Sequence, residues 1–449
     1  MQPLEAVAPI RLPEVPPAAR WSPALRTAFR FLFSYFVLCF LINRILGFNA
    51  TLLGRYAGLW HVIVVWVGKQ VLHTRYDIDA VEPGISNTAH GTILFLCYVA
   101  LAAVATAVWS ALDRKRENYA RLHQWFRLLL RLSLALAMIS YGTLKVIPTQ
   151  MIAPPPPFVL LQRFGELPPM RLLWLFIGSS PAYESFTGCA ELLGGILLLL
   201  PRTTLLGALI CCADMTMVVM LNFCYDVHVK LYSLHLLCMA VLLVAPDLRR
   251  LADLFLFNRT VEPAQEPRLF ARKGLDPSLQ TLFLLLGLAA IGVDFHKSYE
   301  QYEQFHPPRP PLYGAWSVDE FAVDGKEVPL YTDPQRWRWA VFQNPGRLTV
   351  ELMIGARQGY NLDLDMKSRI MMLAKRRVDP RGNLLLGADG KPQVAADGRA
   401  RFSFDASQPD ALILDGTLNG HPTHARLSRM ALTASSFRWI IVFPKEEEE

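Results

Sequence analysis

The sequence predicts a helical membrane domain of about seven spans followed by an antiparallel β domain. Hydrophobic side chains make up 52% of the 449 residues and charged side chains only 18%, which is too apolar for a soluble protein. Long apolar segments recur between residues 31 and 293, as expected for spans. From residue 312 onward, short alternating segments are separated by tight-turn sequences, which indicates strands.

The distribution of charge argues against binding of nucleic acid, and the cysteine pattern argues against a metal site. The 45 basic and 38 acidic residues give a net charge of +7, but the basic residues cluster in short connections between apolar segments. In that position they set membrane topology, so we expect membrane lipid as the surroundings and no nucleic acid as a partner. The seven cysteines lie in or beside apolar segments and form no CxxC pair, so no metal site is indicated.

The N-terminal part contains one predicted span. Residues 1–24 are rich in proline and alanine without periodicity, and we expect them to be disordered. The membrane domain is predicted to cover residues 25–298, and its first span is the apolar run 31–46, whose flanking arginines, Arg30 among them, would snorkel to the interface. Residues 57–72 are apolar but short, which favours an interfacial or re-entrant helix.

Six further apolar segments predict the remaining spans. They are residues 91–112, 128–145, 190–200, 205–223, 231–245 and a shorter one at 282–293. Pro148 and the proline run 154–157 exclude a helix there, and residues 170–177 predict a short helix on the bundle.

The basic connections predict the orientation. With the N-terminus in the cytoplasm of an inner or plasma membrane, segments 113–121, 201–204 and 247–276 lie inside, and they hold most of the loop arginines and lysines. Seven spans then place the chain after residue 298 on the extracytoplasmic side. Six or eight spans would reverse the side of that part.

The C-terminal third is predicted to be a β domain. After a linker at 299–311, the domain covers residues 312–444 and ends in an acidic tail at 445–449. Predicted strands are 336–342, 348–353, 360–365, 399–405, 411–418 and 438–443, separated by turns such as Asn-Pro-Gly, Ala-Asp-Gly and Asn-Gly. Repeated strands with tight turns indicate an antiparallel barrel or sandwich. Gly314-Ala-Trp316 near its start and Arg438 near its end resemble the GxW strand and late arginine of the lipocalins.

Polar residues recur in the predicted hairpin from residue 183 to residue 230. Glu184 and Glu191 are seven apart and share a helical face, and Asn222, Asp226 and Lys230 follow at spacings of four. Hydrocarbon disfavours such side chains, so they predict a polar site inside the bundle. The structural alternative is that they only lock the helices together.

Tyr141 and Lys145 add two polar groups near the outer end of the 128–145 span. They lie four residues apart and face the same way. Lys145 would act as a general base or hold an anionic group, with Glu191 as its counter-charge, whereas the alternative is snorkelling to the interface. Asp226 and Lys230 would form a structural clasp or pair with the other charged groups.

Two histidines offer a weaker pattern. His228 and His235 are seven apart and would share a face of the 231–245 helix, with Asp214 across the hairpin. The sequence lacks HxxxH or ExxH spacing here, so we expect no metal site.

These motifs together resemble a known family. The motifs are Tyr141-Gly142, Lys145, Pro148, Gln150, Phe186, Gly188, Glu191, Gly194-Gly195, Arg202-Thr203, Asn222, Tyr225-Asp226-Val227 and Lys230. Across residues 25–260 the pattern is similar to the DoxX-like membrane proteins, which resemble the membrane subunit of thiosulfate:quinone oxidoreductase and, more distantly, the vitamin K-dependent carboxylase fold. The resemblance implies a four-helix core and quinone-linked or thiol redox chemistry. The extra spans, the β domain and the lack of paired redox cysteines depart from the thiosulfate enzyme.

The resulting hypothesis is a redox protein that binds a quinone or another hydrophobic small molecule and works with a redox partner protein. Tyr141, Lys145 and Glu191 would contact the polar end of the ligand. The expected substrate site also includes Glu184, Asn222, Asp226, His228, Lys230 and Gln150. One alternative is a non-catalytic carrier or assembly factor whose β domain binds lipid or a protein partner. Another is carboxylase-like base chemistry at Lys145.

Overall fold

The structure is a computed structural model with two compact units. It describes residues 20–42, 51–79, 87–151, 155–262, 275–330, 333–379, 384–387 and 392–432. The helical unit comprises residues 1–143 and 187–295, and the second unit comprises residues 144–186 and 296–449. Residues 1–19 of the segment 1–24 that was predicted to be disordered lie outside the described residues, as does the acidic tail. The prediction was wrong at the end of that segment, because a helix begins at Pro23.

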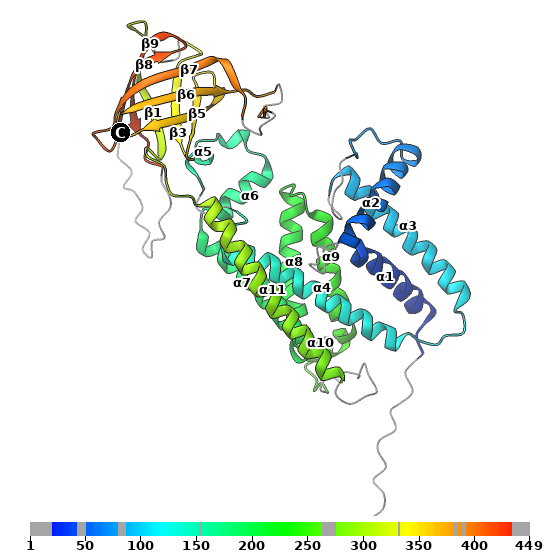
Figure 1. Cartoon of the computed structure of the whole chain (residues 1–449). Helices are drawn as coiled ribbons and strands as arrows, with labels where there is room; N and C mark the ends of the chain where they lie inside the picture. Colours follow the sequence, from blue (N-terminus) through cyan, green and yellow to red (C-terminus); the bar gives the residue numbers. More distant parts are fainter. Residues whose placement is uncertain are drawn as a thin grey trace, which may run out of the picture. The chain divides into compact units, whose positions relative to one another are not determined.

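The helices of the helical unit follow the apolar segments of the sequence (Figure 1). They are α1 (Pro23–Ile42), α2 (Thr51–Trp66) with the π-helix η2 (Val67–Val71), α3 (Ala89–Leu112), α4 (Ala120–Val146), α7 (Pro181–Leu199), the 3-10 turn η4 (Pro201–Thr203), α8 (Thr204–Cys224), α9 (Lys230–Val244), the 3-10 turn η5 (Ala245–Asp247), α10 (Leu248–Phe255) and α11 (Leu275–Phe305). Of these, α4, α7 and α11 continue into the second unit.

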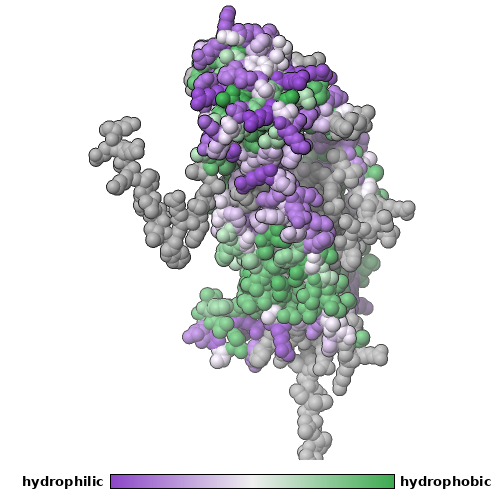
Figure 2. Space-filling model, turned by 60° about the vertical axis from the view of Figure 1, so that its left-hand side comes forward, coloured by the Kyte–Doolittle hydropathy of each residue, from purple (hydrophilic) through white to green (hydrophobic). Residues whose placement is uncertain are grey.

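Five helical segments of the described part of the chain are long and apolar enough to cross a membrane. They are Ala89–Leu112, Ala120–Val146, Pro201–Cys224, Lys230–Phe255 and Leu275–Phe305. Figure 2 shows a continuous band of apolar side chains with hydrophilic side chains along its border, as lipid contact requires. The chain is therefore a membrane protein, and the five segments agree with five of the seven predicted spans.

Two predictions about these helices were wrong in extent. The span predicted at 282–293 is part of the 31-residue helix α11, which continues to Phe305. Residues 299–305 are therefore helical and not linker. The polar residues of this stretch, such as Lys297 and Glu300, hid the helix because only its apolar part was counted as a span.

The core of the helical unit is formed by apolar side chains from several helices. Phe36, Tyr98, Leu134, Cys211 and Met239 are fully buried there and come from α1, α3, α4, α8 and α9. Glycines let helices approach closely, because a Cβ at Gly195 of α7 would lie 3.0 Å from the Ala135 carbonyl oxygen of α4. Gly195 therefore has a packing role at this helix contact.

The second unit combines a closed β-barrel with short helices. The helices are α5 (Pro157–Leu160), the 3-10 turn η3 (Phe164–Glu166) and α6 (Pro169–Gly178), close to the helix predicted at 170–177. The strands are β1 (Gly314–Val323), β2 (Lys326–Glu327), β3 (Trp337–Phe342), β4 (Arg347–Leu352), β5 (Arg357–Asp365), β6 (Ile370–Arg376), β7 (Val394–Asp405), β8 (Ala411–Leu418) and β9 (His421–Arg429).

The barrel is an antiparallel meander. Each long strand pairs with the next along the chain, and β9 pairs with β1, for example Leu427 with Val318, so eight strands close the barrel. Its interior is filled by buried side chains that include Trp316, Trp337 and Phe402. An eight-stranded barrel has an interior wide enough for such side chains or for one small ligand.

An arginine of the described barrel lies beside the tryptophan of the GxW-like motif. Arg429 of β9 lies 4.6 Å from the centre of the Trp316 ring and donates a hydrogen bond to the Tyr313 carbonyl at 2.9 Å. Arg438 and the strand predicted at 438–443 lie outside the described residues.

Candidate functional site

Buried polar residues of the helical unit meet around Glu191. This residue is only 2% exposed and lies midway along α7. It is close enough to Tyr141 of α4 for their charges to interact, and the Tyr141 ring lies 5.9 Å from the ring of Tyr232 in α9. Three helices therefore contribute an acid and two phenols to one buried region of an apolar bundle, and such a combination is a candidate functional site in a membrane protein.

Two further buried polar groups of the bundle come from α8 and α9. Asn222 is buried and its amide donates a 2.9 Å hydrogen bond to the Ser233 hydroxyl, next to Tyr232. Cys211, also of α8, interacts electrostatically with Glu191 and with Asp214. We call Tyr141, Glu191, Tyr232, Asn222 and Ser233 the polar cluster.

Tyr232 and Ser233 were not among the predicted site residues. They lie two and three residues after Lys230, and the prediction, which was based on charged groups, left these neutral residues out. The signal was present, because a serine and a tyrosine in an otherwise apolar span need hydrogen-bond or ring partners.

A second polar group, in the second unit, contains Lys145, Glu184 and Gln150. Glu184 is fully buried in the first turn of α7, where the helix dipole favours a carboxylate. Its Oε1 accepts a 3.0 Å hydrogen bond from the Met151 backbone N–H, and Lys145 at the end of α4 interacts with it electrostatically. The Gln150 carbonyl accepts a 3.1 Å hydrogen bond from the Trp174 indole of α6.

This second polar group has a structural role. It fastens the chain after α4 to the start of α7 and to α6, and the Ser185 hydroxyl adds a 3.1 Å hydrogen bond to the Val146 carbonyl. The sequence placed Lys145 opposite Glu191, but within the second unit its acidic neighbour is Glu184. The pairing of Lys145 with Glu191 stays a prediction.

The turn between α8 and α9 holds Asp226, His228 and Lys230. Lys230 and Asp226 form the predicted clasp, and the lysine keeps the pKa of the Asp226 carboxyl below its usual value. The Asp226 side chain is 74% exposed, so this pair is a surface contact and not part of a buried recess.

The prediction that His228 and His235 share a helical face was wrong. Helix α9 begins at Lys230, which leaves His228 in the turn. There the His228 carbonyl accepts from the Asn87 backbone N–H at 3.4 Å, while the Asn87 side-chain oxygen accepts from the Leu231 backbone N–H at 3.1 Å. His235 instead stacks on Tyr35 of α1, with ring centres 5.6 Å apart, and hydrogen-bonds to its hydroxyl.

The expected snorkelling of Arg30 was also wrong. This residue is 4% exposed and donates hydrogen bonds to Tyr119, to Ser110 and to the Asp113 carbonyl. Its guanidinium is satisfied inside the protein because the connection after α3 folds back over α1.

Comparison with known proteins gives one informative match. No family profile matches the chain, and no solved structure matches it. The protein YwoB of Bacillus subtilis, which carries the description "uncharacterized", is 33% identical over 134 residues. The match covers 28% of this chain and 79% of YwoB, so the chain belongs to the same family as YwoB.

Proposed function

We propose that the helical unit binds the polar end of a lipid-soluble molecule at the polar cluster, with a quinone as the first candidate. The observation that carries the proposal is the burial of Glu191 near Tyr141, whose ring in turn contacts that of Tyr232, in a bundle of largely apolar helices. An acid in hydrocarbon is costly unless it has a role or a partner. Tyrosine hydroxyls and a carboxyl group are suited to hydrogen-bond the carbonyl oxygens of a quinone.

The resemblance to DoxX-like proteins supports the same ligand class. A quinone that is reduced takes up protons as well as electrons, and Glu191, Tyr141 and Tyr232 are groups that exchange protons. The electrons would come from a redox partner protein, because the chain offers no paired cysteines. Binding is therefore the step that the polar cluster itself explains and the step to be tested.

The test measures binding of a water-soluble quinone analogue to the purified full-length protein. Binding is monitored by the quenching of the protein's tryptophan fluorescence. Glu191→Gln and Tyr141→Phe each remove one hydrogen-bonding group while keeping the size of the side chain. We expect affinity to fall about tenfold in each variant, the effect of one lost hydrogen bond.

The control is Glu117→Gln, which makes the same change at an exposed glutamate of the helical unit and should leave affinity unchanged. Lys145→Met tests the second polar group, and we expect it to lower thermal stability while leaving quinone affinity within about twofold of the unaltered protein. Unchanged affinity in both Glu191→Gln and Tyr141→Phe would remove the polar cluster from the proposal.

The alternative of a carrier whose β domain holds lipid stays a prediction. The described part of the barrel core contains buried aromatic and aliphatic side chains, among them Trp337, Tyr360 and Phe402. A protein partner for the outer surface of the barrel stays a prediction. The interaction of Lys145 with its neighbour Glu184 is explained by a structural role. It therefore gives no support to base chemistry at Lys145.

A further inference from the structure

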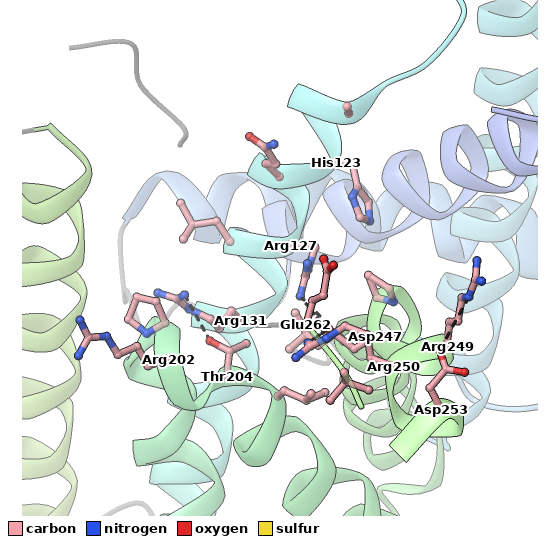
Figure 3. A pocket seen from close by; sticks show the side chains of 18 of the residues that line it. His123, Arg127, Arg131, Arg202, Thr204, Asp247, Arg249, Arg250, Asp253 and Glu262 are labelled. Atoms are coloured by element: carbon pink, nitrogen blue, oxygen red, sulfur yellow. Dashed lines mark hydrogen bonds and ion pairs between the residues drawn. The ribbon is translucent and has the colours of Figure 1, made fainter. Parts of the chain in front are cut away.

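A cavity in the helical unit is lined by an excess of basic side chains. It has a volume of about 1420 Å³ and lies between the start of α4, the start of α8 and the segment that runs from the end of α9 to Glu262 (Figure 3). Its basic lining residues are Arg127, Arg131, Arg202, Arg249 and Arg250, against three carboxylates. The three basic connections that the sequence placed on one side of the membrane thus all contribute to it.

The carboxylates of the lining do not balance these arginines. Asp247 lies 2.5 Å from Arg250 and also 3.9 Å from Arg127, so one negative charge serves two guanidinium groups. Asp253 is shared in the same way, between Arg249 at 4.0 Å and Arg259 at 3.8 Å. Because each of these carboxylates is shared by two arginines, the side chains keep a net positive charge. This excess positive charge attracts an anion.

Arg131 brings a buried guanidinium to the same cavity. It lies one turn after Arg127 on α4 and is only 8% exposed. The Thr204 hydroxyl lies 3.5 Å from its Nη1, and the Phe283 ring centre lies 5.4 Å from its guanidinium carbon. These contacts hold a planar donor group in a fixed orientation, which suits two-point recognition of phosphate oxygens.

We propose that this cavity binds a phosphate group and that the headgroup of an anionic phospholipid supplies it. The lining combines arginines with the apolar side chains of Leu128, Leu205 and Leu243, and it lies at the ends of three segments long enough to cross a membrane. Basic pockets between transmembrane helices bind anionic lipid headgroups in this way. A free phosphate ion offers the same oxygens without acyl chains and is the alternative source.

The test measures retention of lipid by the full-length protein in detergent, using native mass spectrometry with added phosphatidylglycerol or phosphatidylcholine. We expect the unaltered protein to retain phosphatidylglycerol preferentially. In the double variant Arg127→Gln/Arg131→Gln that preference should weaken by about tenfold or more, the effect of losing two cationic groups near a headgroup. Arg121→Gln is the matched control, because Arg121 is an exposed arginine in the first turn of α4 that does not line the cavity.

A second double variant distinguishes the loss of the two charges from a loss of folding. Arg127→Lys/Arg131→Lys keeps both charges and should retain at least part of the preference for phosphatidylglycerol. Inorganic phosphate in the same assay identifies the source: if it binds with the same dependence on the two arginines while the lipids are retained equally, the site takes free phosphate. Equal retention of both lipids together with no phosphate binding overturns the proposal, and so does an equal loss in Arg121→Gln.

Discussion

At the scale of single residues, Arg30 makes the sharpest stability prediction. Its Nε and Nη2 donate to the Tyr119 hydroxyl at 3.0 and 2.7 Å, and Nη1 donates to Ser110 at 2.8 Å. Arg30→Ala removes a buried cation and leaves its acceptors unsatisfied, so the free energy of unfolding should fall by about 3 kcal/mol. Thermal unfolding in detergent measures it. Arg20→Ala, which breaks an exposed ion pair with Glu117, should cost less than about 1 kcal/mol, and equal losses would contradict the burial argument.

A glycine of α4 gives a second prediction. A Cβ at Gly142 would lie 2.7 Å from the Leu192 backbone nitrogen and 2.8 Å from the Gly188 carbonyl oxygen of α7. Gly142→Ala should therefore separate α4 from α7 and destabilise the protein by about 1–3 kcal/mol, with weakened binding at the neighbouring Tyr141. Gly58→Ala in α2 is the control, because nothing lies within 4 Å of a Cβ there. The same thermal assay should show no loss for this control, and a similar loss in both would refute the close-approach explanation.

Residue-level contacts were predictable from the sequence only where the partners are close along the chain. The Asp226–Lys230 clasp is a spacing of four, and the structure contains it. The partners of Arg30 lie 80 and 89 residues away, and Tyr35 contacts His235 across 200 residues. Such pairs depend on which helices become neighbours, and periodicity within one segment does not determine that.

At the scale of elements, Arg357 of β5 supplies the charged contacts between the barrel and the α5–η3 segment, beside the apolar packing of Phe158 against Trp339. Arg357 contacts Glu351 at 3.1 Å and Glu166 at 3.2 Å, and its guanidinium carbon lies 5.3 Å from the centre of the Phe158 ring. Arg357→Ala should loosen α5 and η3 while the barrel stays folded, because the buried Glu351 keeps a second partner in Arg338. Hydrogen exchange of residues 155–167 should accelerate several-fold.

The control for this change is Arg369→Ala. Arg369 forms an exposed ion pair with Asp405 on the barrel, far along the chain from α5. It should leave exchange in residues 155–167 unchanged. Faster exchange throughout the barrel in Arg357→Ala would show that the residue supports the β domain itself and not its contact with α5.

Turn sequences predicted some strand boundaries and concealed others. Asn419 and Gly420 both have positive φ and form the tight turn between β8 and β9, as the sequence predicted. The predicted Ala-Asp-Gly turn at 396–398 lies inside β7 instead, where Gly398 has φ +92° and a Cβ would meet the side chain of Lys375. The same residue types serve a hairpin turn or an irregular strand position, and the pairing partner decides between them.

At the scale of the whole molecule, five of the seven predicted spans coincide with helical segments long and apolar enough to cross a membrane, because membrane solvent imposes a length and an apolar composition on a helix. The spans at 31–46 and 190–200 stay predictions. The three basic connections could also be identified from the sequence, and residues from all three line one cavity. The polar cluster was predicted only in part, since Tyr141, Glu191 and Asn222 were named but Tyr232 and Ser233 were not. The ring contact of Tyr141 with Tyr232 depends on α4 and α9 being neighbours, which no local pattern encodes.

The final prediction concerns the side of the membrane on which the barrel lies. Only one described helix, α11, separates the basic segment around Arg249 from the barrel, and its 31 residues span about 46 Å at 1.5 Å per residue, more than the hydrocarbon core of about 30 Å. If basic connections are cytoplasmic, the barrel is extracytoplasmic whatever the total number of spans. In a variant without native cysteines, we expect Asp410→Cys to react with an impermeant maleimide in intact cells and Arg249→Cys to react only after permeabilisation. Both side chains are exposed, so the membrane alone determines whether the maleimide reaches each position. Labelling of both positions from one side would show that α11 does not cross the membrane.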